Sequence, residues 1–323
     1  MAAPMPVPPP VTRATRPSNT SSRNSGMVPP VAQHGRPRAM RLIVTGGSSF
    51  VGAWFALRAA REHDVCALHH ATPLALPGVT PVRVDLRRAR DIRRLAALDA
   101  DAVVHLAAKV KGPGAPALNR AMMDAVLALE LPVVYASSTV VHWSQRTAYG
   151  DSRREDEQRL VDSGLPHAII RPSAPYGPRL LGHQPGHRES FHTLAALVCR
   201  SRVVPVIGDG RYHRQPLHVD DLSAAILALL ARGPSGQAVD AGGGDALRFD
   251  DIVDTIASAA GRRVAKLHLP KALFTRLARL SADFDPELIA AVDADEQVDN
   301  RPLEAATGVH PRRFADGVQD LLA

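Results

Sequence analysis

The stretch MRLIVTGGSSFVG, residues 40–52, decides the fold. An apolar strand, Arg41–Thr45, runs into a glycine-rich loop, and residues 50–62 follow as a predicted helix. At a strand–loop–helix junction, such a loop brings backbone amides close to a pyrophosphate at the helix N-terminus. Gly46 permits the tight turn, and Gly52 lets the helix pack against the sheet. The stretch therefore predicts a dinucleotide site formed by Thr45, Gly46, Ser48, Ser49, Phe50, Val51 and Gly52.

Beyond this stretch, strand-like and helix-like segments alternate, which indicates a parallel, doubly wound sheet. The predicted strands are residues 64–68, 82–84, 102–106, 133–136 and 168–170. The predicted helices between them are residues 89–98, 118–129 and 149–161. The rhythm breaks after Pro172, and further helices are predicted at residues 189–200, 220–231, 249–260, 271–282 and 314–322. We therefore predict an α/β fold, a Rossmann doubly wound parallel sheet with a smaller C-terminal substrate-binding lobe.

The first 39 residues differ in composition from the rest of the chain. They hold nine prolines and five arginines but no acidic residue. Such a segment cannot bury a core, so we expect a disordered tail. The predicted organisation is a tail over residues 1–39, a Rossmann cofactor-binding domain over 40–172, and a mainly substrate-binding lobe over 173–323. Some segments of that lobe are expected to return to the Rossmann sheet.

Charge and cysteine content argue against several classes of protein. The formal net charge is +7, and five of the arginines lie in the tail, so the body is nearly neutral and offers no basic patch for nucleic acid. Cys66 and Cys199 are too few for a disulfide framework or a cysteine-based zinc site. The longest apolar run, residues 222–231, is too short to cross a bilayer. We expect a cytoplasmic protein with no nucleic-acid or membrane partner.

No metal site is expected either. Three histidines, His183, His187 and His192, lie close together in the sequence. Pro185 and Gly186 prevent the first two from sharing a helix face, and no carboxylate lies at ligand spacing. We expect these histidines to line a mobile substrate loop.

The glycine loop and several later segments resemble one family, the extended short-chain dehydrogenases/reductases, also called the NAD-dependent epimerase/dehydratase family. Its signature TGxxGxxG is matched by Thr45, Gly46 and Gly52, with Ser49 at the middle glycine. The resemblance covers essentially residues 40–323 and implies an enzyme that binds NAD or NADP. It also implies three sets of cofactor contacts. Asp85 and Leu86 would meet the adenine, Leu106, Ala107 and Ala108 would line the cofactor after the fourth strand, and Pro172 would lie at the nicotinamide.

The end of the second strand governs the choice between NAD and NADP. An acidic residue there hydrogen-bonds the ribose and repels a 2′-phosphate. This chain has His69 and His70 instead, and a histidine can donate to a phosphate. The cofactor is therefore NADP or NAD, with NADP favoured and His69 as a contact. The alternative is that both histidines are exposed loop residues of no consequence.

The candidate catalytic residues are Ser138, Tyr149 and Arg153. Ser138 follows the fifth strand, and Tyr149 begins a helix eleven residues later. A hydroxyl can orient the substrate oxygen, and a phenol with a pKa of about 10 can move its proton if a cation lies nearby. Arg153 lies four residues on, on the same helix face. The family has lysine there, and the resemblance implies that Tyr149 and Arg153 also contact the cofactor, although a guanidinium fork differs from a compact ammonium.

Two departures bear on the substrate. The family's dehydratases carry acids just beyond the catalytic serine, where this chain has Thr139 and Val140, so dehydration is disfavoured. In nucleotide-sugar members an arginine at the position of Arg214 clamps the diphosphate. The alternative is a surface arginine before a helix capped by Asp220. A second phosphate-binding arginine has no match in residues 294–298. The resemblance implies substrate contacts from Ser138, Thr139, Tyr149 and Arg214.

Three functions follow as hypotheses. The first is hydride transfer on a nucleoside-diphosphate sugar by a 4-ketoreductase or a 4-epimerase. The reductase is favoured because the missing acid at His69 and the short Ser138–Tyr149 loop resemble the reductases of deoxysugar pathways. The second is an NAD(P)-dependent reductase of a carbonyl substrate that is not a nucleotide sugar. The third is a catalytically degenerate NAD(P)-binding scaffold or sensor, suggested by Ser49 and Arg153. A homodimer is left open.

Overall fold

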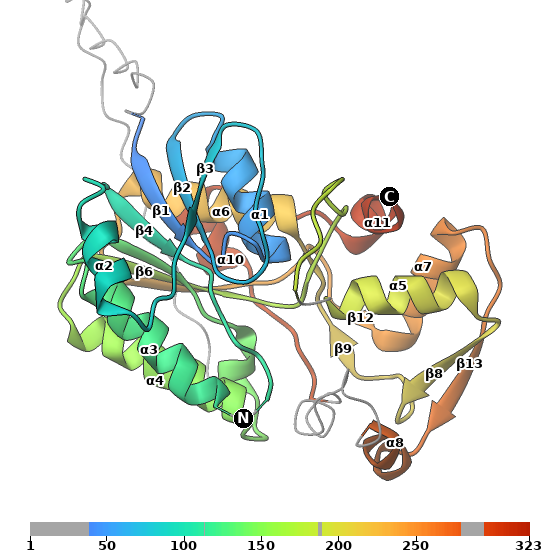
Figure 1. The fold of residues 1–323 in the computed structure, drawn as a ribbon. Coiled ribbons are helices and arrows are strands. Elements are labelled where there is room, and N and C mark those ends of the chain that lie inside the picture. Colours follow the sequence, from blue (N-terminus) through green and yellow to red (C-terminus); the bar gives the residue numbers. More distant parts are fainter. Residues whose placement is uncertain (1–38, 113, 187–188, 279–293) are drawn as a thin grey trace, which may run out of the picture. The chain divides into compact units, whose positions relative to one another are not determined.

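A computed structural model of the chain describes residues 39–112, 114–186, 189–278 and 294–323 (Figure 1). The described residues belong to one compact unit. The predicted tail, residues 1–39, lies outside them except for its last residue. None of the helices in the described ranges has the length and apolar character that a bilayer crossing requires.

The centre of the fold is a parallel sheet, which has seven strands within the described residues. Its order is β11-β6-β5-β4-β1-β2-β3. The strands are β1 Arg41–Thr45, β2 Asp64–His69, β3 Val79–Arg83, β4 Ala102–His105, β5 Val133–Ala136, β6 His167–Pro172 and β11 Gln237–Ala241. The strand order reverses between β1 and β4, and ligands of such sheets bind at the carboxyl ends beside this reversal.

Helices cover both faces of the sheet, because successive side chains of a buried strand point to opposite faces (Figure 1). In β1, Leu42 and Val44 face one apolar core and Ile43 faces the other. The first core is closed by α1 Phe50–Ala59, α6 Val219–Arg232 and α10 Arg301–Thr307. The second is closed by α2 Ala89–Ala96, α3 Ala115–Leu127 and α4 Ala148–Asp162.

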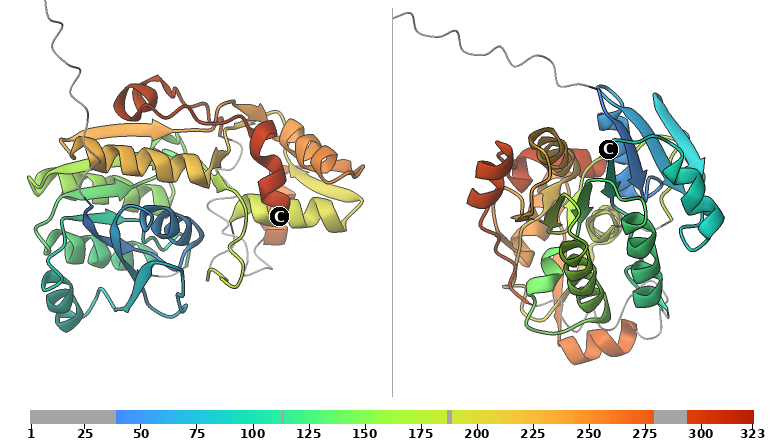
Figure 2. Two further views of the ribbon diagram at one scale, coloured as in Figure 1. Left: turned by 90° about the horizontal axis from the view of Figure 1, so that it is seen from above. Right: turned by 90° about the vertical axis from the view of Figure 1, so that its left-hand side faces the viewer.

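A third apolar core forms around Tyr176, Phe191 and Phe314. The helices that close it stand apart from the central sheet (Figure 2). This core is closed by α5 Ser190–Arg200, α7 Phe249–Ala259 and α11 Phe314–Leu322. Short paired strands flank it: β7 Pro175–Tyr176 with β10 Leu217–His218, β9 His213–Arg214 with β12 Leu247–Arg248, and β8 Val203–Ile207 with β13 Ala265–Leu269. The remaining described elements are the 3-10 helix η1 Thr139–His142 and α8 Lys271–Ala278.

The observed elements confirm the predicted α/β class, although several bounds differ and some strands were not predicted. Helix α3 begins at Ala115, three residues before the predicted start, since Gly114 takes a left-handed φ of 77° and Pro116 suits the first turn. The third strand begins at Val79, earlier than the predicted residue 82. The end of the predicted helix 271–282 lies outside the described residues.

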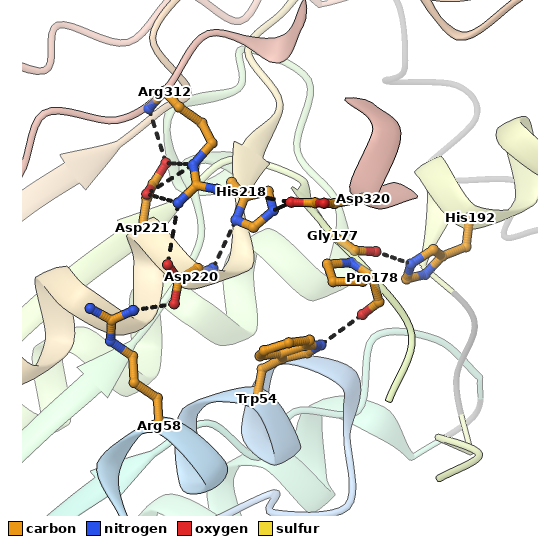
Figure 3. A network of polar contacts seen from close by, with 10 residues as sticks. All are labelled: Trp54, Arg58, Gly177, Pro178, His192, His218, Asp220, Asp221, Arg312 and Asp320. Atoms are coloured by element: carbon orange, nitrogen blue, oxygen red, sulfur yellow. Dashed lines mark hydrogen bonds and ion pairs between the residues drawn. The ribbon is translucent and has the colours of Figure 1, made fainter. Parts of the chain in front are cut away.

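A polar network ties the C-terminal segments to α1 (Figure 3). Arg58 pairs with Asp220, and Arg312 donates to Asp220 and, through several bonds of 2.8–3.2 Å, to Asp221. The predicted N-cap at Asp220 is wrong: α6 begins at Val219, and its N-cap is His218, whose side chain accepts from the Asp220 amide. Asp220 therefore lies in the first turn, where its carboxylate suits the helix dipole.

Candidate active site

The glycine-rich loop lies where β1 and β4 separate, and its backbone leaves no room for a side chain at Gly46. That residue has φ +69°, and a Cβ there would lie 2.8 Å from the backbone of Ala107. The Thr45 hydroxyl accepts from the amides of Leu106 and Ala107, each at 3.1 Å. The two predicted cofactor segments are thus joined at the carboxyl ends of neighbouring strands, and this is a cradle that a dinucleotide fits.

Ser49, at the middle glycine position of the signature, is the N-cap of α1. Its φ is −77°, so the position does not demand glycine, and its hydroxyl accepts from the Gly52 amide at 3.0 Å. The added side chain is therefore turned toward the helix, where an N-cap serine stabilises the first turn. A Cβ on Gly52 would lie 2.1 Å from the Gly46 carbonyl oxygen, so this signature glycine is required.

The other predicted cofactor residues surround this loop. Phe50 is buried, and its ring is nearly perpendicular to that of His192, with 4.7 Å between the ring centroids. Val51 packs on the first apolar core. Ser48 is half-buried, and Ala108 is exposed just beyond β4. Pro172 ends β6, where its carbonyl oxygen lies 3.3 Å from the Thr139 hydroxyl oxygen.

The end of β2 carries a cluster of polar groups beside Asp85. Arg87 binds both oxygens of the Asp85 carboxylate at 2.8 Å, and His70 Nε2 lies 3.8 Å from one of them. The Arg87 guanidinium holds the pKa of the Asp85 carboxyl well below its usual range. Among the described residues, His69 Nδ1 is buried without a hydrogen-bond partner, and Leu86 packs on the second core. The Arg87 guanidinium therefore neutralises the Asp85 carboxylate near the end of β2.

Ser138, Tyr149 and Arg153 come together between β5 and α4. Ser138 caps η1, and Thr147 caps α4 by accepting from the Gly150 amide at 3.0 Å, which fixes Tyr149 in the first turn. Burial raises the pKa of the Tyr149 phenol; the Arg153 charge lowers it, Glu189 and Asp156 raise it, and the Ser138 hydrogen bond lowers it. Arg153 thus lowers the pKa of Tyr149 as predicted, but burial has the larger effect, and the pKa is raised overall.

Arg153 is fully buried, and its guanidinium carbon lies 5.3 Å from the centroid of the Tyr149 ring and 5.5 Å from that of the Tyr135 ring. Its NH2 donates to Asp156 Oδ2 at 2.9 Å. Its Nε and NH1 have no hydrogen-bond partner among the described residues. Buried donors of this kind are normally satisfied, so these atoms fit a bound group that supplies acceptors, as a nicotinamide ribose does.

A buried histidine extends this cluster toward the glycine loop. His105 Nδ1 lies 2.7 Å from the Thr45 hydroxyl, and its ring stacks on Tyr135 at 5.4 Å between centroids. Burial, together with the smaller effect of the Arg153 charge, lowers the pKa of His105 to about 3. His105 is therefore neutral near physiological pH.

Glu296 is a site residue that the sequence did not single out. Thr139 donates to the Glu296 carboxylate and also lies 3.3 Å from the Pro172 carbonyl oxygen. Burial raises the pKa of the Glu296 carboxyl, while Thr139 and the Arg214 charge lower it. No local sequence pattern connects residues 294–298 to the fifth strand, so this position of Glu296 could not be predicted.

Arg214, the predicted diphosphate clamp, is buried between aromatic rings. Its guanidinium carbon lies 5.0 Å from the Tyr212 ring centroid and 5.5 Å from that of Trp143. Its NH1 donates to the carbonyls of His213, at 2.8 Å, and Ala294. Part of its donor capacity is thus used within the chain, and the clamp stays a prediction. The alternative of a surface arginine is wrong, since only 7% of Arg214 is exposed.

The histidines considered for a metal occupy separate places. His192 is buried in α5, within the predicted helix over residues 189–200, and its Nε2 lies 2.8 Å from the Gly177 carbonyl oxygen (Figure 3). His183 Nε2 lies 3.1 Å from the Ser48 carbonyl oxygen. His187 lies outside the described residues. Within the described ranges, no group of three metal-ligating side chains is present.

The fold and this site define a nicotinamide-dependent enzyme of the extended short-chain dehydrogenase/reductase type. The chain belongs to the NAD dependent epimerase/dehydratase family, whose model matches residues 42–242. It is 26% identical to a dTDP-glucose 4,6-dehydratase of Mycobacterium tuberculosis, over 83% of this chain and 97% of that protein.

Solved structures of this fold include several similar to the chain. A dTDP-glucose 4,6-dehydratase of Bacillus anthracis in complex with NAD has a TM-score of 0.72 at 18% identity, covering 88% of this chain and 96% of that one. A UDP-glucose 4-epimerase of Bifidobacterium longum in complex with NAD+ and UDP has a TM-score of 0.72 at 19% identity, covering 87% and 97%.

Proposed function

We propose that this chain transfers a hydride between a nicotinamide cofactor and a sugar carbon of a nucleoside-diphosphate sugar. The observation that carries the proposal is the cluster of Ser138, Tyr149 and Arg153 beside the glycine cradle. Two Arg153 donors there have no partner within the described part of the chain. The relatives support the substrate class, because the dehydratases and the epimerase named above act on dTDP-glucose and UDP-glucose.

When bound, the nicotinamide would supply or accept the hydride. Thr45, Gly46 and the α1 N-terminus would hold the pyrophosphate, and the Arg153 donors would face the adjoining ribose. Ser138 would orient the substrate oxygen, and Tyr149 would exchange its proton. Because its pKa is raised, Tyr149 keeps its proton near neutral pH and suits the donor role needed to reduce a ketone. We therefore favour a 4-ketoreductase over a 4-epimerase.

Purified protein would be assayed for NADPH consumption with a 4-keto sugar nucleotide, and for interconversion of UDP-hexoses without net use of cofactor. We expect the first activity. If the protein only interconverts UDP-hexoses and consumes no NADPH, it is an epimerase and not a reductase. Thermal shift with UDP, GDP and dTDP is the companion measurement, and stabilisation by none of them would favour a carbonyl substrate without a nucleotide.

The absence of an acid at the end of β2 supports NADP over NAD as the preferred cofactor. Residue 69 is a histidine, which would not repel a 2′-phosphate, and the nearby Asp85 carboxylate is neutralised by Arg87. The dissociation constants of NADPH and NADH, measured by fluorescence, should differ in favour of NADPH. Equal constants would remove the preference.

Dehydration is a second candidate, favoured by Glu296. Its carboxyl group lies on the Thr139 hydroxyl, which follows Ser138 directly. After oxidation of a sugar carbon to a ketone, the carboxylate could take the proton from the neighbouring carbon. The C–H electron pair would form a carbon–carbon double bond, and the carboxyl would return the proton to a departing hydroxyl, which leaves as water. A raised pKa suits such a proton carrier.

Replacing Glu296 by Gln separates the two candidates. If dehydration occurs, the wild type should exchange the proton next to the ketone with deuterated water, and Glu296→Gln should lower that exchange by about 100-fold or more. Asp295→Asn is the matched control, because Asp295 is the exposed neighbour that pairs with His213. Mass spectrometry of the product measures the uptake of deuterium. If the wild type takes up none, dehydration is ruled out.

A further inference from the structure

The buried pair of Arg153 and Asp156 is the feature of the site that the proposed reaction leaves unexplained. The two residues lie three apart on α4, with side chains 0% and 2% exposed and 2.9 Å between Arg153 NH2 and Asp156 Oδ2. A buried cation without a counter-charge is strongly unfavourable, and Asp156 supplies that charge. The Tyr135 hydroxyl also donates to Asp156 Oδ2, at 3.4 Å.

The same carboxylate determines which Arg153 donors remain available. The guanidinium is planar, and it lies near two aromatic rings, so one fixed bond sets the direction of its other N–H groups. With NH2 on Asp156, Nε and NH1 stay without partners among the described residues. An ammonium has three rotating donors on a flexible stem and needs no such anchor.

We propose that Asp156 is a positioning residue that allows an arginine to act beside Tyr149 where the family has a lysine. It holds one arm of the Arg153 guanidinium, so that Nε and NH1, which are shielded from solvent and have no partner among the described residues, are the donors left for a bound cofactor. This inference rests on the proposed hydride transfer for its purpose, but its tests on Tyr149 titration and cofactor affinity require no sugar substrate.

Asp156 also acts on the electrostatics of Tyr149. The charged groups near the phenol are Arg153 and Asp156 from α4 and Glu189 before α5, whose pKa burial raises to about 7; the Ser138 hydroxyl hydrogen-bonds it. The guanidinium is further faced by Glu157, Tyr135 and His105. In this set Asp156 raises the pKa of Tyr149, against the effect of Arg153. Its neutralisation should therefore lower that pKa.

Asp156→Asn tests the charge, since asparagine keeps the shape and an acceptor oxygen for Arg153. Ultraviolet absorbance of the tyrosinate, with the Tyr149→Phe protein as the reference, follows the Tyr149 titration without any substrate. We expect it to move to lower pH in Asp156→Asn. An unchanged or higher titration midpoint would overturn the electrostatic part of the proposal.

Asp156→Ala tests the anchor. We expect it to weaken NADPH binding by about tenfold or more, as loss of a hydrogen bond to a charged group does. The double variant Arg153→Lys with Asp156→Ala also lacks the counter-charge, so it should be less stable than the wild type. It should nevertheless recover most of that affinity, because a flexible ammonium can turn its donors toward the cofactor without an anchor. A double variant no better than Asp156→Ala would overturn the positioning role.

Glu155→Gln is the matched control, since Glu155 is an exposed acid of the same helix that pairs with Arg120. It should change neither the Tyr149 titration nor NADPH binding. Failure of every sugar nucleotide to react, with these two signatures present, would reject the proposed function and retain the role of Asp156.

Discussion

Tyr149→Phe is expected to lower turnover by about 100-fold or more, because the phenol is the group that exchanges a proton with the substrate oxygen. Cofactor affinity should stay nearly unchanged, since a phenyl ring keeps the contact with the Arg153 guanidinium. Steady-state rates and NADPH dissociation constants of both proteins provide the measurement.

Tyr176→Phe is the control for that variant. Tyr176 lies in the third core, and its buried hydroxyl has no hydrogen-bond partner among the described residues, so its loss should leave turnover close to that of the wild type. If Tyr149→Phe retains substantial turnover while the fold is intact, the acid–base assignment is wrong. Glu189 would then be the next acid to examine, because it faces Tyr149.

Arg153→Ala is expected to destabilise the protein by about 3–5 kcal/mol, since it leaves Asp156 buried without its counter-charge. The Asp156 pKa is raised by burial and held down by Arg153, so it should rise further in the variant. A carboxyl with a raised folded-state pKa is best tolerated when protonated. The stability deficit should therefore be smaller at acidic pH and grow as pH rises through that pKa.

The same variant should change the pH dependence of turnover. Arg153 lowers the pKa of Tyr149, so its removal should raise that pKa further and move the limb of the pH–rate profile to higher pH. Arg153→Lys keeps the charge and should retain or raise activity. Thermal unfolding at several pH values and pH–rate profiles test both effects. A stable Arg153→Ala protein with an unshifted profile would contradict the assignment.

Much of the fold could be predicted because its signals are local. The strands β1 and β5 were predicted to the residue, since each is a short apolar run that meets a turn at its carboxyl end. The strands β8, β11 and β13 were missed. Each is short and owes its conformation to a parallel partner distant in sequence, as β11 does to β6.

The candidate site divides in the same way. Ser138, Tyr149 and Arg153 lie within sixteen residues of one another in the sequence, so spacing alone could connect them. Glu296 lies 157 positions from its partner Thr139, and no pattern relates the two before the chain folds. The tail and His187 lie outside the described residues, and their predicted properties stay predictions.

The sequence by itself determined the class of fold and the position of the glycine-rich loop, because strand periodicity and the left-handed backbone of Gly46 are consequences of a few adjacent residues. Only the tertiary structure decided how Ser49 and Arg153, the two departures from the family pattern, are accommodated. Ser49 turns to cap α1, and Asp156 neutralises Arg153 in a space closed by β5 and α4. Burial is a property of the packed chain, so the pKa of Tyr149 and the need of Arg153 for a partner emerge only when these elements meet.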